Sequence, residues 1–159
     1  MNDVHHEFMR AALEEARNAA EAGEIPVGAV IVRAGAVIAR AHNRNRRDRN
    51  PLLHAEMIAI EIACRAMGNE RLIDCDLYVT KEPCAMCAGA LVHARLRAVY
   101  IGARDVKYGA CGTVLAVCGS PALNHRPAIE FGLLEQESTA LLGGFFKRLR
   151  NHHTKERPE

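Results

Sequence analysis

Two short motifs rich in histidine, cysteine and glutamate constrain this chain more than any other feature. The first is His54-Ala55-Glu56 and the second is Pro83-Cys84-Ala85-Met86-Cys87. Histidine nitrogen and cysteine thiolate are ligands that Zn²⁺ prefers, and three protein ligands leave the fourth tetrahedral position open for a water molecule. The sequence therefore predicts one catalytic zinc ion per chain, bound by His54, Cys84 and Cys87.

The two motifs also predict local structure. Cys84 and Cys87 have the i, i+3 spacing that places two side chains on one face of a helix, and Pro83 suits the first turn of such a helix. His54 opens an apolar run with helical spacing, so Glu56 is expected beside the metal without binding it. A metal ligand and an uncoordinated carboxylate are thus predicted side by side.

Each motif alone has an ordinary interpretation. A CxxC pair in a cytosolic chain is often a redox pair or half of a structural zinc site, and a lone His-x-Glu is usually the start of a helix. Together the motifs match H-x-E…P-C-x-x-C, the known signature of zinc-dependent nucleobase deaminases, and the chain resembles these enzymes. That resemblance makes Glu56 the predicted catalytic residue, acting as general acid and base.

Length and composition predict one domain without disulfide bonds. A chain of 159 residues can bury a core of its own, and we expect a single zinc-dependent deaminase domain at 1–151 with a frayed tail at 152–159. No apolar run approaches the roughly 18 residues of a membrane span, and acidic residues interrupt the N-terminus, unlike a signal peptide. We therefore expect a soluble, cytoplasmic protein without membrane contact. In a reducing compartment the cysteines outside the motif are expected to be buried or free thiols: Cys64, Cys75, Cys111 and Cys118.

The first third of the chain predicts a helix, a hairpin and a loop. Residues 4–21 carry apolar side chains at helical spacing, and Gly23 ends this helix. The β-branched run Val27–Val32 predicts a buried strand, which a turn at Gly35 pairs with residues 36–40. Residues 42–51 lack an apolar period and are rich in arginine and asparagine, so they are expected to form a loop.

The remaining residues continue the alternation of strands and helices. We expect helices at 54–67, after Pro83 and at 134–150, and strands at 76–81, 98–102 and 129–131. Residues 103–119 form an irregular segment punctuated by glycine. Helices alternating with strands predict an α/β fold in which helices are layered on a sheet.

Further segments narrow the resemblance to one family within this class. They are Ile25–Val30, Leu77–His93, Gly102–Asp105, Asn124–Arg126 and the pair Phe145-Phe146. With the two motifs, they make the chain resemble the bacterial tRNA-specific adenosine deaminases of the cytidine deaminase superfamily. The resemblance implies a three-layer α/β/α cytidine deaminase-like fold with a central five-stranded mixed sheet, and a homodimer. The implied reaction is hydrolytic conversion of adenosine to inosine at the wobble position of a tRNA anticodon.

The same resemblance assigns substrate contacts. Asn43 is expected to hydrogen-bond a flipped base. The other residues expected at the base are Val27, Ala55, Pro83, Asp105 and Lys107. The residues expected to meet the RNA of an anticodon stem-loop are Arg44, Arg46, Arg47, Arg49, Phe146, Lys147, Arg148 and Arg150. The alternatives are a solvated surface for the charge runs and an ordinary loop residue for Asn43.

Three positions depart from the family pattern, namely Leu52, Leu53 and Tyr108. Bulk at these positions could narrow a channel for flanking nucleotides or suit a small planar ligand. Two other functions therefore stay open: a deaminase of a free base or nucleoside of the guanine, adenine or cytosine type, and a zinc-stabilised RNA-binding module without catalysis. The basic loop favours RNA, and Glu56 argues against a purely binding role, because a structural zinc site needs no free carboxylate.

Overall fold

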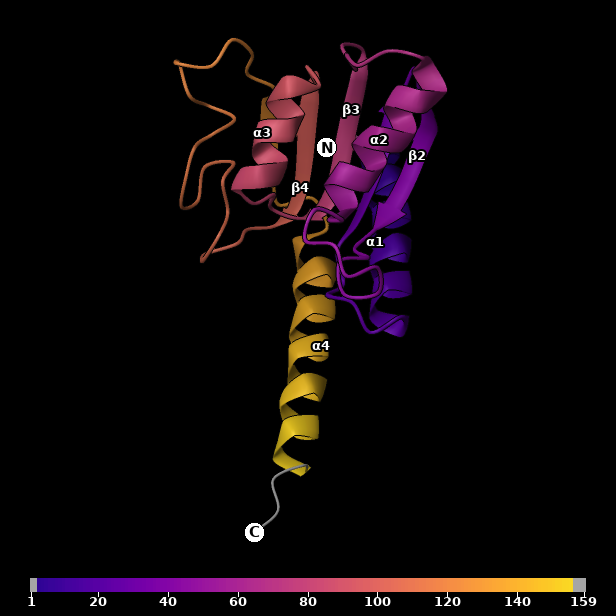
Figure 1. Ribbon diagram of the computed structural model, residues 1–159, viewed down its shortest axis with the longest axis vertical. Helices are drawn as coiled ribbons and strands as arrows, with labels where there is room; N and C mark the ends of the chain where they lie inside the picture. The colour runs from indigo at the N-terminus through magenta and orange to yellow at the C-terminus, as the bar shows by residue number, and fades with distance from the viewer. Residues whose placement is uncertain (1–2, 156–159) are drawn as a thin grey trace.

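The computed structural model describes residues 3–155 and contains a five-stranded sheet in the order β2-β1-β3-β4-β5 (Figure 1). The strands are β1 (Gly28–Arg33), β2 (Ala36–His42), β3 (Cys75–Lys81), β4 (Ala98–Ala103) and β5 (Ala128–Phe131). β1 pairs antiparallel with β2 and β3, whereas β3, β4 and β5 run parallel to one another. The predicted mixed sheet is confirmed, and each predicted strand overlaps an observed one.

Helices cover both faces of this sheet. They are α1 (Asp3–Glu21), α2 (Ala55–Met67), α3 (Ala85–His93) and α4 (Glu135–Lys155). α2 and α3 lie side by side on one face, while α1 packs on the other face together with the first turns of α4 (Figure 1). The three-layer α/β/α arrangement is therefore confirmed.

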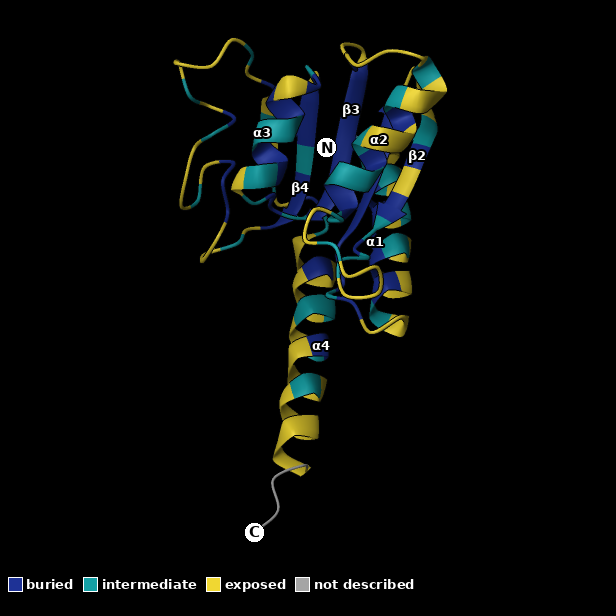
Figure 2. Ribbon diagram, viewed as in Figure 1, coloured by how far each residue is buried: buried dark blue, intermediate teal, exposed yellow. Residues whose placement is uncertain are grey.

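The central strands supply apolar side chains to two separate cores. In β1, Ile31 packs into the core beneath α2 and α3, whereas Val30 and Val32 pack toward α1. In β3, Leu77 packs into the core beneath α2 and α3, and Tyr78 packs toward α1. Successive side chains of a strand point to opposite faces, so a sheet covered on both sides requires a continuous apolar run. These strands are accordingly buried along their length (Figure 2).

The last helix is longer than the sequence predicts. α4 continues to Lys155, so residues 152–155 are helical and the expected tail at 152–159 was placed too early. The sequence contains no glycine or proline between Phe145 and Pro158, so no residue there interrupts the helical hydrogen bonds. Residues 156–159 of the predicted tail lie outside the described range. The second half of α4 extends away from the sheet and is largely exposed (Figures 1 and 2).

One edge of the sheet collects the chain segments that carry the two motifs. β1 begins where β2 ends, because Gly28 pairs with His42, and β3 and β4 end together, because Lys81 pairs with Ala103. Ala29 pairs with Val79, which places the start of β1 at this same edge. The segments just before β1 and just after β2, β3 and β4 therefore meet there. Within residues 3–155, no helix is both long and apolar enough to cross a membrane.

Candidate active site

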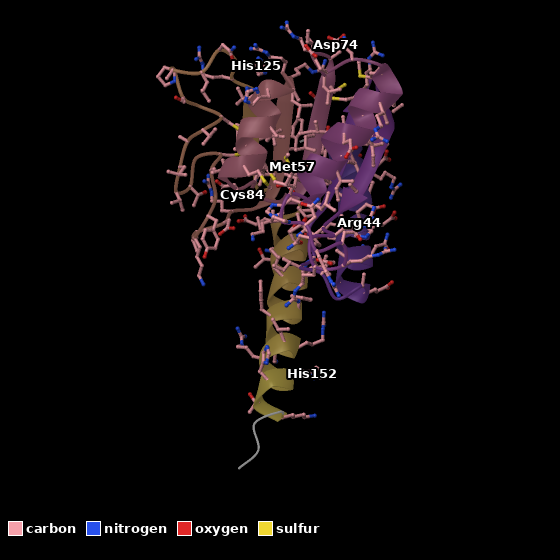
Figure 3. All side chains as sticks on the ribbon, viewed as in Figure 1. Arg44, Met57, Asp74, Cys84, His125 and His152 are labelled. Carbon is pink, nitrogen blue, oxygen red and sulfur yellow. The ribbon has the colours of Figure 1, made fainter. Side chains whose placement is uncertain are left out.

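The three predicted metal ligands meet where α2 and α3 begin. His54 is the N-cap residue of α2, Cys84 is the N-cap residue of α3, and Cys87 lies in the first turn of α3 (Figure 3 labels Cys84). His54 Nδ1 lies 3.7 Å from Cys84 Sγ and 3.5 Å from Cys87 Sγ. A tetrahedral zinc ion with Zn–S near 2.3 Å and Zn–N near 2.0–2.1 Å separates such atoms by about 3.5–3.6 Å. The spacing of these side chains therefore fits one zinc ion.

The protonation of this cluster also suits a cation. A hydrogen bond from Cys87 and the neighbouring His54 lower the pKa of the Cys84 thiol to about 3, so Cys84 is a thiolate at neutral pH. The hydrogen bond with Cys84 in turn raises the pKa of His54. The hydrogen bond to Cys84, together with burial, raises the pKa of Cys87, so we expect this thiol to release its proton when the site binds metal. Both cysteines lie at the N-terminus of α3, where the helix dipole favours negative charge.

Glu56 lies in the first turn of α2 and faces the same site. Its side chain is buried, and it lines the same cavity as His54 and Cys84. Burial raises the pKa of the Glu56 carboxyl, although its backbone hydrogen bond and His54 oppose this effect. A pKa raised by burial suits a carboxyl to act as general acid and base, because such catalysis is most efficient when the pKa moves from its ordinary value toward the working pH. Among residues 3–155, the cluster of metal-ligand atoms contains His54, Cys84 and Cys87 and does not include Glu56.

A cavity of about 620 Å³ opens over the metal ligands. This volume lies within the range of roughly 300–1,000 Å³ that is typical of sites for small molecules. Four of the predicted base contacts line it: Val27, Asn43, Asp105 and Lys107. The other two, Ala55 and Pro83, are buried and are not among the lining residues.

The three departures from the family pattern lie in different places. Tyr108 lines the cavity with 69% of its surface exposed, so it stands at the mouth. Leu52 and Leu53 are not among the lining residues, and Leu52 is 54% exposed. Of the three positions, only Tyr108 therefore contributes to the wall of the cavity.

Asn43 is held by the backbone on both sides of the site. Its Oδ1 accepts a hydrogen bond from the N–H of Ala55 at 2.9 Å, and its Nδ2 donates to the carbonyl of Ile25 at 3.2 Å. The side chain thereby ties the segment before β1 to the first residue of α2, next to His54. An amide nitrogen carries two hydrogens, so the second N–H of Nδ2 remains for a substrate acceptor. The predicted contact with a base stays a prediction.

Asp105 shapes the loop that follows β4. Its carboxylate forms an ion pair with Lys81 Nζ at 3.0 Å and accepts the backbone N–H groups of Lys107 and Tyr108 at 2.9 and 3.1 Å. Burial acts to raise the pKa of Asp105, but the hydrogen bonds from Lys81 and from the backbone hold it below its ordinary value. Asp105 is thus an ionised group that fixes the position of Lys107 and Tyr108 at the cavity.

The arginine-rich loop lies beside the cavity, and hydrogen bonds to Glu24 hold its backbone. The buried Glu24 carboxylate accepts the backbone N–H groups of Arg46 and Arg47 at 3.2 and 2.6 Å. The side chains of Arg46, Arg47 and Arg49 are exposed, and none of them lines the cavity. Arg44 forms an ion pair with Asp48 at 2.7 Å. The loop therefore presents most of its positive charge to solvent at one side of the mouth.

α4 contributes the other predicted RNA contacts. Phe146 lines the cavity and is 38% exposed, whereas Phe145 is buried. The exposed basic residues that follow along the projecting part of the helix are Lys147, Arg148 and Arg150. His152 lies still farther out, while Cys84 and Arg44 lie toward the end of the sheet from which α4 extends (Figure 3).

Sequence reasoning missed several residues at this site. Lys81, Arg104 and Leu142 line the cavity, although the sequence predicts no role for any of them. The most consequential omission is Glu82, a buried carboxylate between the end of β3 and Pro83. Its place directly before the cysteine motif is the one sequence signal that could have identified it.

A family model agrees with this fold and ligand set. The model of the cytidine and deoxycytidylate deaminase zinc-binding region matches residues 2–103. This range contains β1 through β4 together with His54, Glu56, Cys84 and Cys87. Fold and site therefore define a zinc-dependent deaminase of this class, and the predicted zinc cofactor is confirmed.

Individual relatives show to which family within this class of deaminases the chain belongs. The tRNA-specific adenosine deaminase of Aquifex aeolicus is 47% identical over 145 residues, which cover 91% of this chain and 95% of that protein. A structure from a study of A-to-I editing at the wobble position of transfer RNA has a TM-score of 0.83 and 48% identity, covering 86% of this chain and 99% of that one. Guanine deaminase from Bacillus subtilis has a TM-score of 0.62 and 35% identity, covering 95% of each chain. The chain belongs to the tRNA-specific adenosine deaminase family.

Proposed function

We propose that this chain hydrolytically converts adenosine to inosine at the wobble position of a tRNA anticodon. The observation that carries this proposal is the buried Glu56 carboxyl, in one cavity with His54 and Cys84. Relatives that are nearly half identical along almost the whole chain are tRNA-specific adenosine deaminases, which supports adenosine in RNA as the substrate.

The proposed chemistry is the addition of water to the adenine ring followed by loss of ammonia. His54, Cys84 and Cys87 would hold a zinc ion, which would supply hydroxide at neutral pH by lowering the pKa of water. The new bond forms at C6 of adenine, and the bond from C6 to the exocyclic amine breaks. Glu56 takes one proton from the water and gives it to the ring nitrogen beside C6. It then takes the remaining proton from the hydroxyl group added at C6 and passes it to the amine, which leaves as ammonia.

The other cavity residues orient the base for this reaction. Asn43 offers its remaining N–H to an acceptor on the base, and Val27 forms part of the apolar wall. The base of an anticodon loop is already poorly stacked, so turning it into the cavity costs about a few kcal/mol. The arginine loop and the basic part of α4 recover this cost by contacts with the RNA backbone. Ala55 and Pro83 are buried and directly adjoin the metal ligands His54 and Cys84 in the chain.

We predict that the arginine loop determines much of the salt dependence of RNA binding. In a variant with Arg44, Arg46, Arg47 and Arg49 replaced by alanine, the log–log slope of affinity against salt should fall by roughly one unit per lost phosphate contact, or less for single strands. Arg65→Ala is the matched control, because Arg65 is an exposed arginine on α2 that pairs with Glu61. Binding measured over a salt series tests this. A parental slope in the loop variant would mean that the loop is a solvated surface.

Substrate choice tests the proposed function directly. Purified protein should form inosine in an anticodon stem-loop far more efficiently than it releases ammonia from free adenine, adenosine or guanine. The reason is that a free base gains nothing from the basic rim, whereas the stem-loop contacts it. Assays of each substrate side by side decide the matter. Ammonia release from a free base, without inosine in any tRNA, would replace this proposal by a small-molecule deaminase.

We further propose that the enzyme acts as a cytoplasmic homodimer. The family resemblance supports the dimer, and so does Ile62, an apolar side chain that is 39% exposed on the outer side of α2. The cytoplasm follows from the proposed substrate, because tRNA is found there. Sedimentation velocity of the zinc-loaded protein measures the oligomeric state.

A further inference from the structure

Glu82 is a buried carboxylate that holds the loop after β4. Its surface is 3% exposed, and it lies between Lys81, the last residue of β3, and Pro83. One of its oxygens, Oε2, accepts the backbone N–H groups of Cys111 at 3.1 Å and Thr113 at 3.2 Å. The other, Oε1, accepts the backbone N–H of Asp105 at 3.3 Å and the hydroxyl of Thr113. A single carboxylate thereby accepts hydrogen bonds from both ends of the segment 105–113.

The segment 105–113 is packed directly against this carboxylate. A side chain at Gly109 would overlap the Glu82 carboxyl group, so the absence of a Cβ lets the loop close over it. A further backbone bond, from the N–H of Ala110 to the carbonyl of Pro83 at 2.9 Å, fastens the same segment to the turn before α3. Buried acceptors need such donors, because an unpaired buried charge is costly.

This segment supplies one wall of the active-site cavity. Asp105, Val106, Lys107 and Tyr108 all line it, together with Glu82 itself. Val106 is 78% exposed and Tyr108 is 69% exposed, so these side chains have little packing of their own to fix them. The position of this wall therefore depends on the hydrogen bonds that Glu82 and Asp105 accept.

We propose that Glu82 is a positioning residue that sets the substrate-contacting wall 105–113 relative to the metal-ligand turn. Cys84 is two residues beyond Glu82 in the chain, so one side chain links the ligand segment to the wall. Glu82 acts through the loop and has no proton to move in the reaction. The expected consequence is a role in substrate affinity that is separate from the role of Glu56 in turnover.

The variant Glu82→Gln tests this inference. Its kinetic measurement rests on the proposed function, because the substrate is an anticodon stem-loop. The amide keeps the shape but turns an N–H₂ group toward backbone N–H donors, so part of the loop loses its anchor. For the anticodon stem-loop we expect KM to rise on the order of 10-fold, since hydrogen bonds to a charged acceptor are lost. We expect kcat to stay within about threefold of the parent, because the interaction is not one made in the transition state alone. Zinc content should be unchanged.

Asp76→Asn is the matched control. Asp76 is also a buried carboxylate on β3, but it lies toward the opposite end of the strand and pairs with Arg97 at 2.9 and 2.7 Å. This variant should lower the melting temperature and leave KM unchanged. An equal rise of KM in Asp76→Asn, or a parental KM in Glu82→Gln, would overturn the proposal. Loss of zinc from Glu82→Gln would also overturn it, because Glu82 would then serve the metal site.

Two further measurements keep the test decisive. Thr113→Val removes one donor with little change of shape, so it tests the same contact if Glu82→Gln fails to fold. Its KM effect should be smaller and non-additive with Glu82→Gln, as expected for partners in one network. Hydrogen exchange of the Asp105, Cys111 and Thr113 amides needs no substrate. If the parent does not deaminate RNA, the proposed function fails, and unchanged exchange in Glu82→Gln then overturns the positioning role independently.

Discussion

Glu56→Gln is expected to abolish turnover while the protein keeps its fold and its zinc. The amide has the shape of the carboxylate, but it cannot carry the protons that must move from water to the ring and to the departing amine. General acid–base catalysis contributes about 10²–10⁴-fold, so kcat should fall by at least about 100-fold. Substrate affinity should stay near that of the parent. Single-turnover inosine formation and metal analysis measure these quantities.

The matched control for this variant is Glu61→Gln. Glu61 lies on the same helix but is exposed and pairs with Arg65 at 2.7 Å, so its charge should not affect the site. Parental kinetics in Glu61→Gln would assign the loss to the position of Glu56 and not to the charge of α2. Near-parental turnover in Glu56→Gln would require another proton carrier in the cavity.

The metal ligands and the fold could be predicted from sequence because their signals are local. Cys84 and Cys87 are three residues apart in one helix, and His54 immediately precedes another helix, so the spacing alone restricts where their side chains point. The apolar runs of β1 and β3 likewise report burial on both faces of the sheet. Family resemblance supplied the sheet topology, which no local pattern determines.

The loop contacts around the cavity could not be predicted in the same way. Glu24 and Glu82 are acidic residues, which are usually exposed, yet each is buried and accepts backbone N–H groups from a loop distant in the chain. Such bonds depend on which strand ends meet at one edge of the sheet. The exposure of Leu52 is a further example, because it depends on the geometry of the loop before His54.

The C-terminal end of α4 lies beyond the position that the sequence predicts. The polar and charged residues between Leu149 and Pro158 resemble a solvated tail in the sequence, but they include no glycine or proline that would stop a helix. A helix that begins on the sheet can continue into solvent until a breaker is reached. The projecting basic part of α4 is the result.

Cys87→Ala is expected to remove zinc from the protein and, with it, all measurable deamination. Cys87 is fully buried at the site, and its sulfur lies 3.5 Å from His54 Nδ1. Among residues 3–155, the group of possible metal ligands contains His54, Cys84 and Cys87 alone, so no fourth side chain is in place to substitute for Cys87. Changes in residues that merely orient a ligand typically weaken metal affinity by about 10–100-fold, and loss of a ligand should exceed about 100-fold. Elemental analysis after dialysis measures the zinc content.

Cys118→Ala is the control that gives this prediction its force. Cys118 is also a buried free cysteine, and its sulfur contacts Cys111 and the carbonyl of Ala88 in α3. The substitution Cys118→Ala therefore removes a similar volume beside the same helix and leaves the three metal ligands unchanged. We expect Cys118→Ala to retain one zinc per chain and near-parental activity. Both variants shorten a buried cysteine near α3. Zinc that persists in Cys87→Ala would refute the three-ligand site. Zinc lost equally from both variants would mean that the packing of α3 controls the metal content.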